Sequence, residues 1–381
     1  MKTLGLHMIA RNSEETLART LECVKGLFDQ IVVVDTGSED NTISLAKSYG
    51  AEVYEFPWID DFSAARNFAL DKITTDWAMW LDTGDVVKPE SVAALMELRQ
   101  TPLFQGKDFD MIWIPINRKL DEFGNPLFSM IVPRIVRMGA KPIWERPIHE
   151  TVTTKEPAEP RNALWDKAAV DDPFSDLVGG AKRNLRILDK MIAAGDDTPR
   201  TMFYRAQELR DLGRAQEAID QWTAFLGTNP QTWEYYDALM NIGRCYYNRN
   251  DETLQDKTNA AGVWLNAIGH DPTQPDAWFS IATLFSETGQ HDKAMVFWRA
   301  CMEMVPDADG RPRNKLMYDD GPYAATAFAL AHIGRNKESL DMFRKAEKAA
   351  VIKGRYKVQM DELKTIIKNQ AKPNATQTAK R

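Results

Sequence analysis

Apolar and polar positions in the first half of the chain alternate between two patterns. Four short runs are predicted to be strands, at residues 3–10, 30–34, 52–56 and 77–81. The second of these runs is apolar and β-branched, as expected for a strand that is buried on both faces. The stretches between the runs have the apolar spacing of amphipathic helices, at residues 14–26, 42–49 and 63–72. Strands that alternate with helices predict right-handed βαβ units and a mostly parallel sheet.

Two further strands are predicted at residues 111–117 and 131–137, with a hairpin turn around residues 121–126. After residue 154 the composition changes, because prolines become frequent and an Asp-Asp-Pro step follows. Proline disfavours helix in the residue before it, so we interpret residues 155–176 as a linker. Residues 1–154 are therefore expected to form one α/β domain.

From residue 177 onward the pattern is almost entirely helical, and it repeats. Pro272 and Pro306 are 34 residues apart, which is the period of tetratricopeptide repeats. Large, small and turn residues recur at matching places in four copies, for example at Trp278, Ala282, Phe285, Gly289, Ala294 and Trp298. Such helix pairs bury their apolar faces only against their neighbours. The sequence thus predicts an all-α, tetratricopeptide-like solenoid over residues 177–368, with a short insertion near 250–255 and a disordered tail at 369–381.

Composition narrows the class of protein. A chain of 381 residues with 44% hydrophobic residues suits two globular domains. The net charge of −7 disfavours broad binding to a nucleic-acid backbone. Three widely spaced cysteines form no metal or redox motif and are expected to be reduced thiols. With no export signal and no apolar run of about 18–20 residues, we expect a cytoplasmic protein without a membrane span.

Two aspartates come directly after predicted strands. Asp35 follows the strand at 30–34, and Asp82 follows the strand at 77–81. Each is followed by a polar turn that contains a glycine, and the first of these, Gly37, is expected to let the backbone approach a ligand. In open α/β sheets, ligands bind beyond the carboxyl ends of parallel strands. Two acids at that edge predict a sugar-nucleotide site. The alternative for Asp35 is an acid that only caps the following turn.

Five motifs in this order resemble those of family 2 glycosyltransferases with the GT-A fold. They lie at residues 11–15, 34–42, 61–67, 80–85 and 149–150. A branch of that family also carries C-terminal tetratricopeptide repeats, so the resemblance covers nearly the whole chain. It implies a GT-A domain with a Rossmann-like sheet, followed by the helical repeats. It also implies that Asp35 contacts a uracil-type base, that Arg66 assists there, and that Asp82 opens the DxD motif.

In the family, the DxD motif binds ribose and a divalent metal, Mn²⁺ or Mg²⁺, that bridges the diphosphate. This chain departs from the motif, because Gly84 stands where a carboxylate is expected. Glycine lets the turn bend, so Asp85 is a substitute ligand. The candidates for metal binding are accordingly Asp82, Asp85 and His149. The alternative for the histidine is an ordinary surface residue.

Charge and proton transfer require further residues. Arg134 and Arg137 are candidate cations for the leaving diphosphate. Glu150 is the candidate general base, beside Asp82 as the second catalytic residue, and its rivals are Glu145 and Asp121. The alternative for Arg66 is a plain ion pair with Asp60 or Asp61.

These features predict a glycosyltransferase that moves a sugar from a nucleotide-diphosphate donor, preferably a UDP-sugar, to a hydroxyl of a large acceptor. The resemblance favours inversion at the anomeric carbon. The concave surface of a solenoid suits a protein or peptide, a glycolipid or a lipopolysaccharide core, and also a protein partner. Modified nucleic acid is a weaker candidate acceptor for an acidic chain. The alternative is a catalytically degenerate, nucleotide-sugar-binding scaffold that recruits a partner through its repeats. A nucleotidyltransferase is disfavoured because residues 11–15 lack a glycine-rich phosphate loop.

Overall fold

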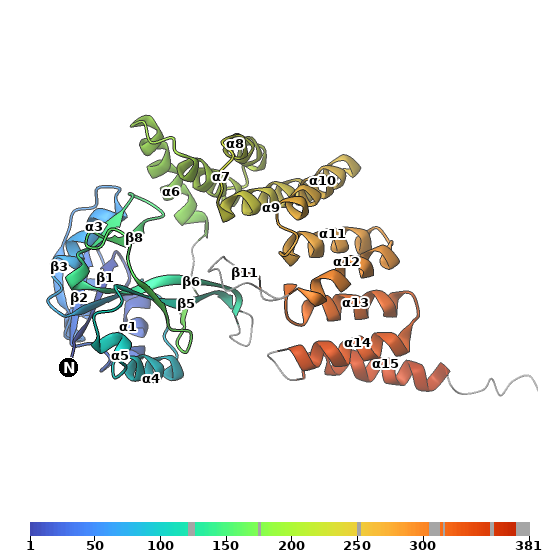
Figure 1. The fold of residues 1–381 in the computed structure, drawn as a ribbon, viewed down its shortest axis with the longest axis horizontal. Helices are drawn as coiled ribbons and strands as arrows, with labels where there is room; N and C mark the ends of the chain where they lie inside the picture. The colour runs from blue at the N-terminus through green and yellow to red at the C-terminus, as the bar shows by residue number, and fades with distance from the viewer. Residues whose placement is uncertain are drawn as a thin grey trace, which may run out of the picture. The chain divides into compact units, whose positions relative to one another are not determined.

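The computed structural model describes residues 1–120, 126–173, 177–249, 253–304, 313–314, 317–350 and 354–370. Contacts divide these residues into two compact units, each described here by itself. The first unit contains residues 1–213 and Arg313, and the second contains most of the chain after residue 213 (Figure 1).

The first unit is built on a mixed sheet with the strand order β10-β5-β6-β4-β1-β2-β3, and β9 also pairs with β5. Strands β3, β2, β1 and β4 are mutually parallel, whereas β6 runs antiparallel to both β4 and β5. The strands are β1 (Leu4–Ala10), β2 (Gln30–Asp35), β3 (Glu52–Glu55), β4 (Trp77–Trp80), β5 (Met111–Leu120), β6 (Pro126–Arg137), β9 (Asn162–Leu164) and β10 (Val170–Asp172). A separate hairpin pairs β7 (Pro142–Glu145) with β8 (Thr151–Thr154).

Helices cover both faces of this sheet, which confirms the predicted α/β class. On one face, Leu6 of β1 packs with Leu17 of α1 in the larger core. Helices α2, α4 and α5 lie on the same face (Figure 1). On the other face, Val34 of β2 packs with Ala69 of α3 and with residues of the β7–β8 hairpin. The helices are α1 (Glu14–Cys23), α2 (Thr42–Ser48), α3 (Phe62–Leu70), α4 (Pro89–Leu98) and α5 (Pro102–Gln105).

The predicted linker is partly sheet. Strands β9 and β10 both lie within residues 155–176 and pair with β5 in parallel. Trp165, Ala168 and Val170 from this segment are buried in the larger core. The prolines thus mark turns between strands, and the apolar residues among them extend the sheet. The predicted hairpin turn at residues 121–126 lies outside the described residues, except for Pro126, which begins β6.

The first helix pair after the sheet belongs to the same unit as the sheet. This pair consists of α6 (Leu177–Ala193) and α7 (Pro199–Asp211). Ile187 and Leu188 of α6 form a small apolar cluster with Ile148 from the loop between β7 and β8. The helical pattern that begins at residue 177 therefore first builds a part of the α/β unit.

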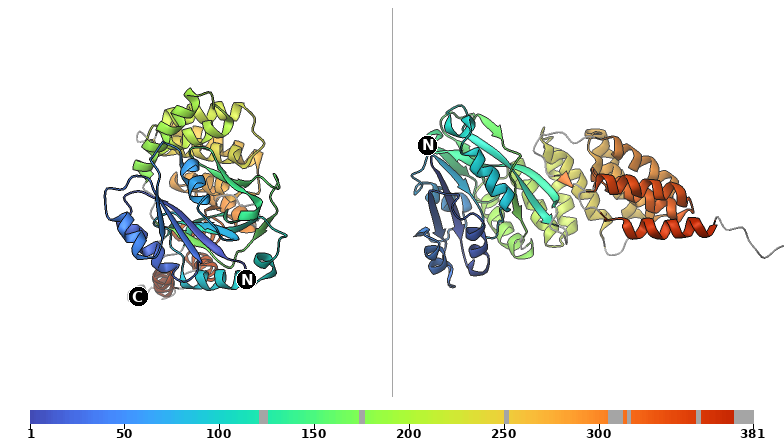
Figure 2. Two further views of the ribbon diagram at one scale, coloured as in Figure 1. Left: turned by 90° about the vertical axis from the view of Figure 1, so that its left-hand side faces the viewer. Right: turned by 90° about the horizontal axis from the view of Figure 1, so that it is seen from below.

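The second unit is a series of helices in which each helix packs against the next (Figures 1 and 2). At Gly243, a side-chain Cβ would overlap with the indole of Trp264, so only glycine permits this approach between α9 and α10. Gly289 turns the chain between α11 and α12 at φ +75°. The helices are α8 (Ala215–Gly227), α9 (Trp233–Tyr247), α10 (Leu254–His270), α11 (Pro275–Glu287), α12 (His291–Glu303), α13 (Gly321–His332), α14 (Asn336–Ala349) and α15 (Lys357–Gln370).

This packing confirms the predicted helical repeats. Pro306, part of the predicted insertion and most of the predicted tail lie outside the described residues. In the described ranges, every helix is too short or too polar to traverse a lipid bilayer.

Removing an aromatic side chain from the repeat core should be costly. Trp298 is 3% exposed and packs among apolar residues of α11, α12 and α13. We expect Trp298→Ala to lower the free energy of unfolding by about 3–5 kcal/mol. Val296 on the same helix is 64% exposed, so Val296→Ala should change it by less than about 0.5 kcal/mol. Urea denaturation measures both, and equal small effects would show that the repeat register is wrong.

Candidate functional site

The two predicted acids flank one strand of the parallel sheet. Asp35 ends β2, and Asp82 lies two residues beyond the end of β4. The strand between them is β1. Because neighbouring strands are about 4.8 Å apart, the two backbones are separated by roughly 10 Å at this edge. A ligand that touches both carboxylates therefore has to cross the carboxyl end of β1.

Asp35 caps a turn and still keeps one oxygen free. Its Oδ2 accepts hydrogen bonds from the backbone amides of Gly37 and Ser38, at 3.0 and 2.9 Å. The residue is only 2% exposed, yet in the described part of the chain Oδ1 has no hydrogen-bond partner. A buried acceptor without a partner costs free energy, so a donor group of a ligand would stabilise it. Gly37 has a φ of +104° and offers no side chain to obstruct that ligand.

The loop after β1 ties the two acidic turns together. The backbone amide of Asn12 donates to Oγ of Ser38 at 2.9 Å, and Oδ1 of Asn12 accepts from the amide of Glu39 at 2.8 Å. On its other side, the Ser13 and Thr83 hydroxyls share a hydrogen bond of 3.0 Å. The first motif thus fixes the turn after β2 and the turn after β4 relative to each other.

Arg66 joins two carboxylates that are far apart in the sequence. Its Nη2 donates to Oδ1 of Asp82 at 2.8 Å, and its Nε donates to Oε1 of Glu150 at 2.7 Å. The guanidinium is almost completely buried. Burial works to lower the pKa of Arg66, but the two carboxylates outweigh it and raise the pKa. Arg66 therefore pairs with neither Asp60 nor Asp61, and the latter caps α3 instead.

Two indole rings complete the surroundings of Arg66. Its guanidinium carbon lies 4.7 Å from the ring centre of Trp80 and 4.8 Å from that of Trp144. Asn67, the next residue on α3, exchanges two hydrogen bonds of 2.8 Å with the backbone of Trp144 and so fixes that ring's strand. Cation–π contacts of this kind favour a charged guanidinium in a dry site.

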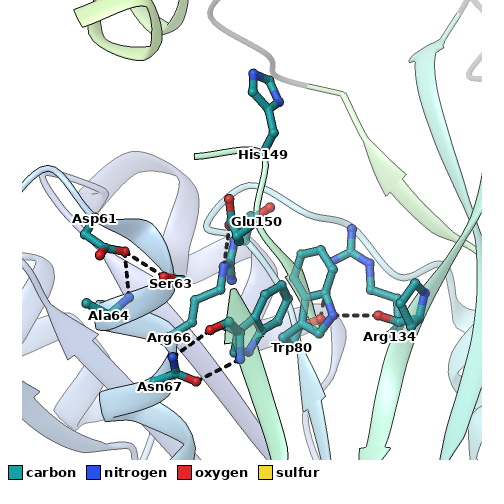
Figure 3. A network of polar contacts seen from close by, with 12 residues as sticks. Asp61, Ser63, Ala64, Arg66, Asn67, Trp80, Arg134, His149 and Glu150 are labelled. Carbon is teal, nitrogen blue, oxygen red and sulfur yellow. Dashed lines mark hydrogen bonds and ion pairs between the residues drawn. The ribbon is translucent and has the colours of Figure 1, made fainter. Parts of the chain in front are cut away.

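A second guanidinium lies close to Trp80. The guanidinium carbon of Arg134 is 3.6 Å from the indole centre (Figure 3). Its Nη1 forms a buried 3.0 Å ion pair with Asp85. Burial raises the pKa of Asp85 to about 6 and lowers that of Arg134. Oδ2 of Asp85 also accepts from the backbone amide of Asp82 at 3.0 Å and closes the turn. Asp85 is thus occupied by its own turn and by Arg134.

Asp82 differs from Asp85 in its exposure. Its side chain is 50% exposed, whereas that of Asp85 is 2% exposed. The partial burial of Asp82 works to raise its pKa, but the cations of Arg66 and Arg134 hold that pKa below the usual value. Asp82 is therefore a carboxylate anion with one side open to solvent.

The structure does not bring the three expected metal ligands together. His149 shares a 2.8 Å hydrogen bond with Glu208 of α7 and points away from the pair of Arg66 and Glu150 (Figure 3). Asp85 faces Arg134, which leaves Asp82 by itself. Across the described ranges, no group of three or more His, Cys, Asp and Glu side chains is placed to hold a metal ion. The sequence motif could not show this, because the partner of His149 comes from a helix far downstream.

Arg137 was predicted beside the diphosphate, and this prediction is wrong. Its register partner is Trp77 at the start of β4, the end of the strand opposite to Asp82. There it pairs with the buried carboxylate of Asp110, which Arg161 also contacts at 2.9 Å. The hydrogen bonds from Arg161 are the main reason that the pKa of Asp110 is lowered. Strand β6 runs antiparallel to β4, so it continues from Arg134 toward the opposite end of the sheet. Arg137, three residues later, therefore lies away from the site.

The candidate bases also differ in their surroundings. Glu150 contacts Arg66 and has a side chain that is 13% exposed. Glu145 lies on β7 opposite Thr151 and is exposed. Asp121 lies outside the described residues. Of the two candidates that the structure describes, Glu150 is the one with an ion pair to another predicted site residue.

A buried histidine and an indole, neither of which was predicted from the sequence, lie beneath the site. His7 of β1 is fully buried, and its ring meets that of Trp144 edge to face, with 6.3 Å between ring centres. Burial is the main cause that lowers the pKa of His7 to about 3, so the ring is neutral at physiological pH. Neither ring nitrogen has a hydrogen-bond partner in the described part. The available signal was a polar residue within an otherwise apolar strand.

The chain therefore combines two parts: an α/β sheet domain with acidic residues at the ends of β2 and β4, and helical repeats that follow it in the sequence. Residues 6–106 match the family described as Glycosyl transferase family 2. This match confirms the resemblance that the motifs indicate and places it in the N-terminal region of the chain.

Curated relatives carry related names. A TPR repeat-containing protein of Synechococcus elongatus is 33% identical over 40% of this chain and 36% of its own length. The SPbeta prophage-derived glycosyltransferase SunS of Bacillus subtilis is 23% identical over 57% of this chain and 52% of its own length. An uncharacterized glycosyltransferase of Rickettsia typhi is 32% identical over 24% of this chain and 30% of its own length. The chain thus spans about a third to a half of these relatives.

Solved structures that resemble the chain include a crystal structure of MamA, with 17% identity and a TM-score of 0.36 over 51% of this chain and 99% of that chain. A thermophilic TPR protein of Thermus thermophilus has 15% identity and a TM-score of 0.35 over 49% of this chain and 92% of that chain.

The position of Arg137 generates a prediction about stability. We expect Asp110→Asn to lower the free energy of unfolding at pH 7 by about 2–3 kcal/mol, because it leaves Arg137 without its buried partner. A depressed carboxyl pKa stabilises the fold above the ordinary pKa and loses this effect as the pH falls. The gap between wild type and variant should therefore shrink below about pH 4.

Urea denaturation across pH measures this gap, and Glu97→Gln, which removes an exposed ion pair with Lys167, is the matched control. The same Asp110 variant should bind UDP as the wild type does. A weaker affinity for UDP in this variant would show that Arg137 does take part in the nucleotide site.

Proposed function

We propose that this protein transfers a sugar from a nucleotide-diphosphate donor, preferably a UDP-sugar, to a hydroxyl group of a large acceptor. The observation that carries the proposal is the buried Arg66, which holds Asp82 and Glu150 at one edge of the sheet. The match of residues 6–106 to a glycosyl transferase family supports the same reaction class.

The donor would lie across the carboxyl end of β1. Oδ1 of Asp35 is buried and lacks a partner in the described part, so it suits an N–H group of a base such as uracil. Asp82 is half exposed on the other side of β1 and suits a ribose hydroxyl or the diphosphate region. Gly37 adds no side chain of its own beside Asp35.

The charge of the site favours a cation that arrives with the donor. Asp35, Asp82, Asp85 and Glu150 carry four carboxylates, against the two guanidiniums of Arg66 and Arg134, and a diphosphate adds more negative charge. Mg²⁺ is commonly bound by one or two carboxylates together with substrate phosphates. Asp82 fits such a role, since it has an exposed side and a depressed pKa. A divalent cation held by Asp82 and the diphosphate would supply charge neutralisation for the leaving group.

Glu150 would act as the general base. Arg66 contacts its Oε1, and no hydrogen bond to its second oxygen is found in the described part of the chain, so that oxygen would accept the proton of an acceptor hydroxyl. In the proposed step the acceptor O–H gives its proton to Glu150, and the acceptor oxygen bonds to the anomeric carbon. The bond between that carbon and the diphosphate oxygen breaks, its electron pair goes to the oxygen, and the nucleoside diphosphate leaves. Attack from the face opposite to the leaving group gives inversion.

The helical repeats would serve the acceptor or a partner. A solenoid suits an extended chain, such as a protein, a peptide or a lipid-linked glycan. The alternative is a nucleotide-sugar-binding scaffold without catalysis, and Gly84 in the third position of the DxD motif favours it. Turnover of a bound UDP-sugar separates the two functions.

The proposed cation site generates a calorimetric prediction. Mn²⁺ alone should show no binding to the protein, but it should strengthen UDP binding about tenfold or more, because Asp82 and the diphosphate hold it together. In Asp82→Asn this enhancement should be lost. Asp76 at the opposite end of β4 is exposed, so Asp76→Asn should keep it. Tight Mn²⁺ binding without UDP would instead indicate a preformed site.

The proposed base generates a kinetic prediction. With a UDP-sugar that the wild type hydrolyses or transfers, Glu150→Gln should lower kcat by about 10²–10⁴, because proton transfer is lost. Its affinity for UDP should stay within about threefold, since Glu150 acts on the acceptor and the proposed donor contacts of Asp35 and Asp82 remain. Glu145→Gln is the matched control and should have normal turnover. If the two glutamine variants exchange these results, Glu145 is the base; a product of retained configuration, identified by NMR, would refute inversion.

A further inference from the structure

The loop that carries Glu150 is clamped by a helix from the pair that follows the sheet. The His149 ring stacks on Tyr204 of α7, with ring centres 3.9 Å apart and an angle of 12° between planes. Its Nε2 shares a 2.8 Å hydrogen bond with Oε1 of Glu208, which is 4% exposed. Asn184 of α6 donates to the same oxygen at 3.1 Å and so fixes the carboxylate. Helix α7 thus supplies the stacking ring and the carboxylate that contact the imidazole, and α6 supplies the amide that holds this carboxylate.

The same loop holds an unusual backbone conformation. His149 has a φ of +51° and Arg146 has a φ of +77°, a region that non-glycine residues seldom occupy. Such a conformation persists only where the surroundings enforce it. Here Arg200 donates to the carbonyl oxygen of His149 at 3.3 Å, and Arg146 donates to the hydroxyl of Thr201 at 2.6 Å. The enforcing contacts come from α7.

Helix α6 is itself attached to the sheet domain by two kinds of contact. Ile187 and Met191 pack with Ile148 of the loop in an apolar cluster. Arg186 forms a 2.7 Å ion pair with Asp60, which precedes α3, and Lys190 pairs with the same carboxylate. The helix pair is thus held against both α3, which carries Arg66, and the loop that carries Glu150.

We propose that α6 and α7 are a working part of the transferase site, with Glu208 and Tyr204 as positioning residues for Glu150. The conformation of His149 sets the direction of the next residue, and Glu150 then meets Arg66 at 2.7 Å. The inference rests on the proposed function, in which Glu150 is the base. It assigns a role to His149 that differs from metal binding.

Two variants of Glu208 test the inference in the full-length protein. Glu208→Ala removes the clamp, whereas Glu208→Gln keeps a group that hydrogen-bonds to either tautomer of His149. The matched control is Asp189→Asn, which breaks a 2.8 Å ion pair with Arg205 between the same two helices but away from the loop. The measurements are amide hydrogen exchange of residues 147–151 and steady-state kinetics with a UDP-sugar that the wild type turns over.

We expect Glu208→Ala to speed exchange in residues 147–151 and to lower kcat about tenfold or more, with the KM for the donor within about twofold, because misplacing a base affects the chemical step. Glu208→Gln should restore most of both properties, and Asp189→Asn should match the wild type. Unchanged exchange and kcat in Glu208→Ala would overturn the inference. The inference would also be overturned if Asp189→Asn lowered kcat and speeded exchange equally, because the effect would then be a general one on the helix pair.

The two proposals fail in different ways. If the wild type turns over no UDP-sugar, the proposed function fails, while the exchange measurement still decides whether Glu208 holds the loop. If Glu208→Ala does not fold, His149→Asn replaces it, because asparagine tolerates a positive φ but lacks the ring that Tyr204 and Glu208 contact. This variant should show the same faster exchange and lower kcat, and wild-type values in it would overturn the inference.

Discussion

The guanidinium of Arg66 is removed from water, and a buried cation is stable only where charge and polarisable groups surround it. Asp82 and Glu150 supply the charge, and two indole rings supply the polarisable faces. The requirement explains why segments distant in the sequence meet at this point: α3, the turn after β4, the β7 strand and the loop after it. Removing any one of these partners leaves part of the cation uncompensated.

The need to pair buried charges also divides the carboxylates of the site into those that stabilise the fold and those that remain for a ligand. Asp85 is neutralised by Arg134 and serves its own turn, while Asp82 stays half exposed and anionic. Asp35 lies across β1 with one oxygen bound to its turn and one without a partner in the described part. Asp85 and Arg134, which pair with each other, stabilise the framework of the site. The exposed side of Asp82 and the second oxygen of Asp35 are the groups that remain for a ligand.

The sequence was sufficient where chemistry follows from position along one strand or helix. Asp35, Asp82 and Arg66 could be assigned to one edge of the sheet because each follows a recognisable strand or motif. Arg137 was misplaced because a motif does not give the direction of β6 relative to β4. The contacts of His149 could not be predicted because its partners, Tyr204 and Glu208, lie more than fifty residues later. In the predicted linker, prolines concealed apolar residues that complete the sheet through long-range pairing.

The membership of α6 and α7 in the first unit bears on how such a chain can be divided or varied. A fragment cut at the end of the sheet would lack the helix that contacts His149, so an autonomous module has to extend to about Gly213. The residues that contact Arg66 all belong to this first unit. The main boundary between the two compact units therefore lies within the helical region, after its first pair of helices, and not at the end of the sheet.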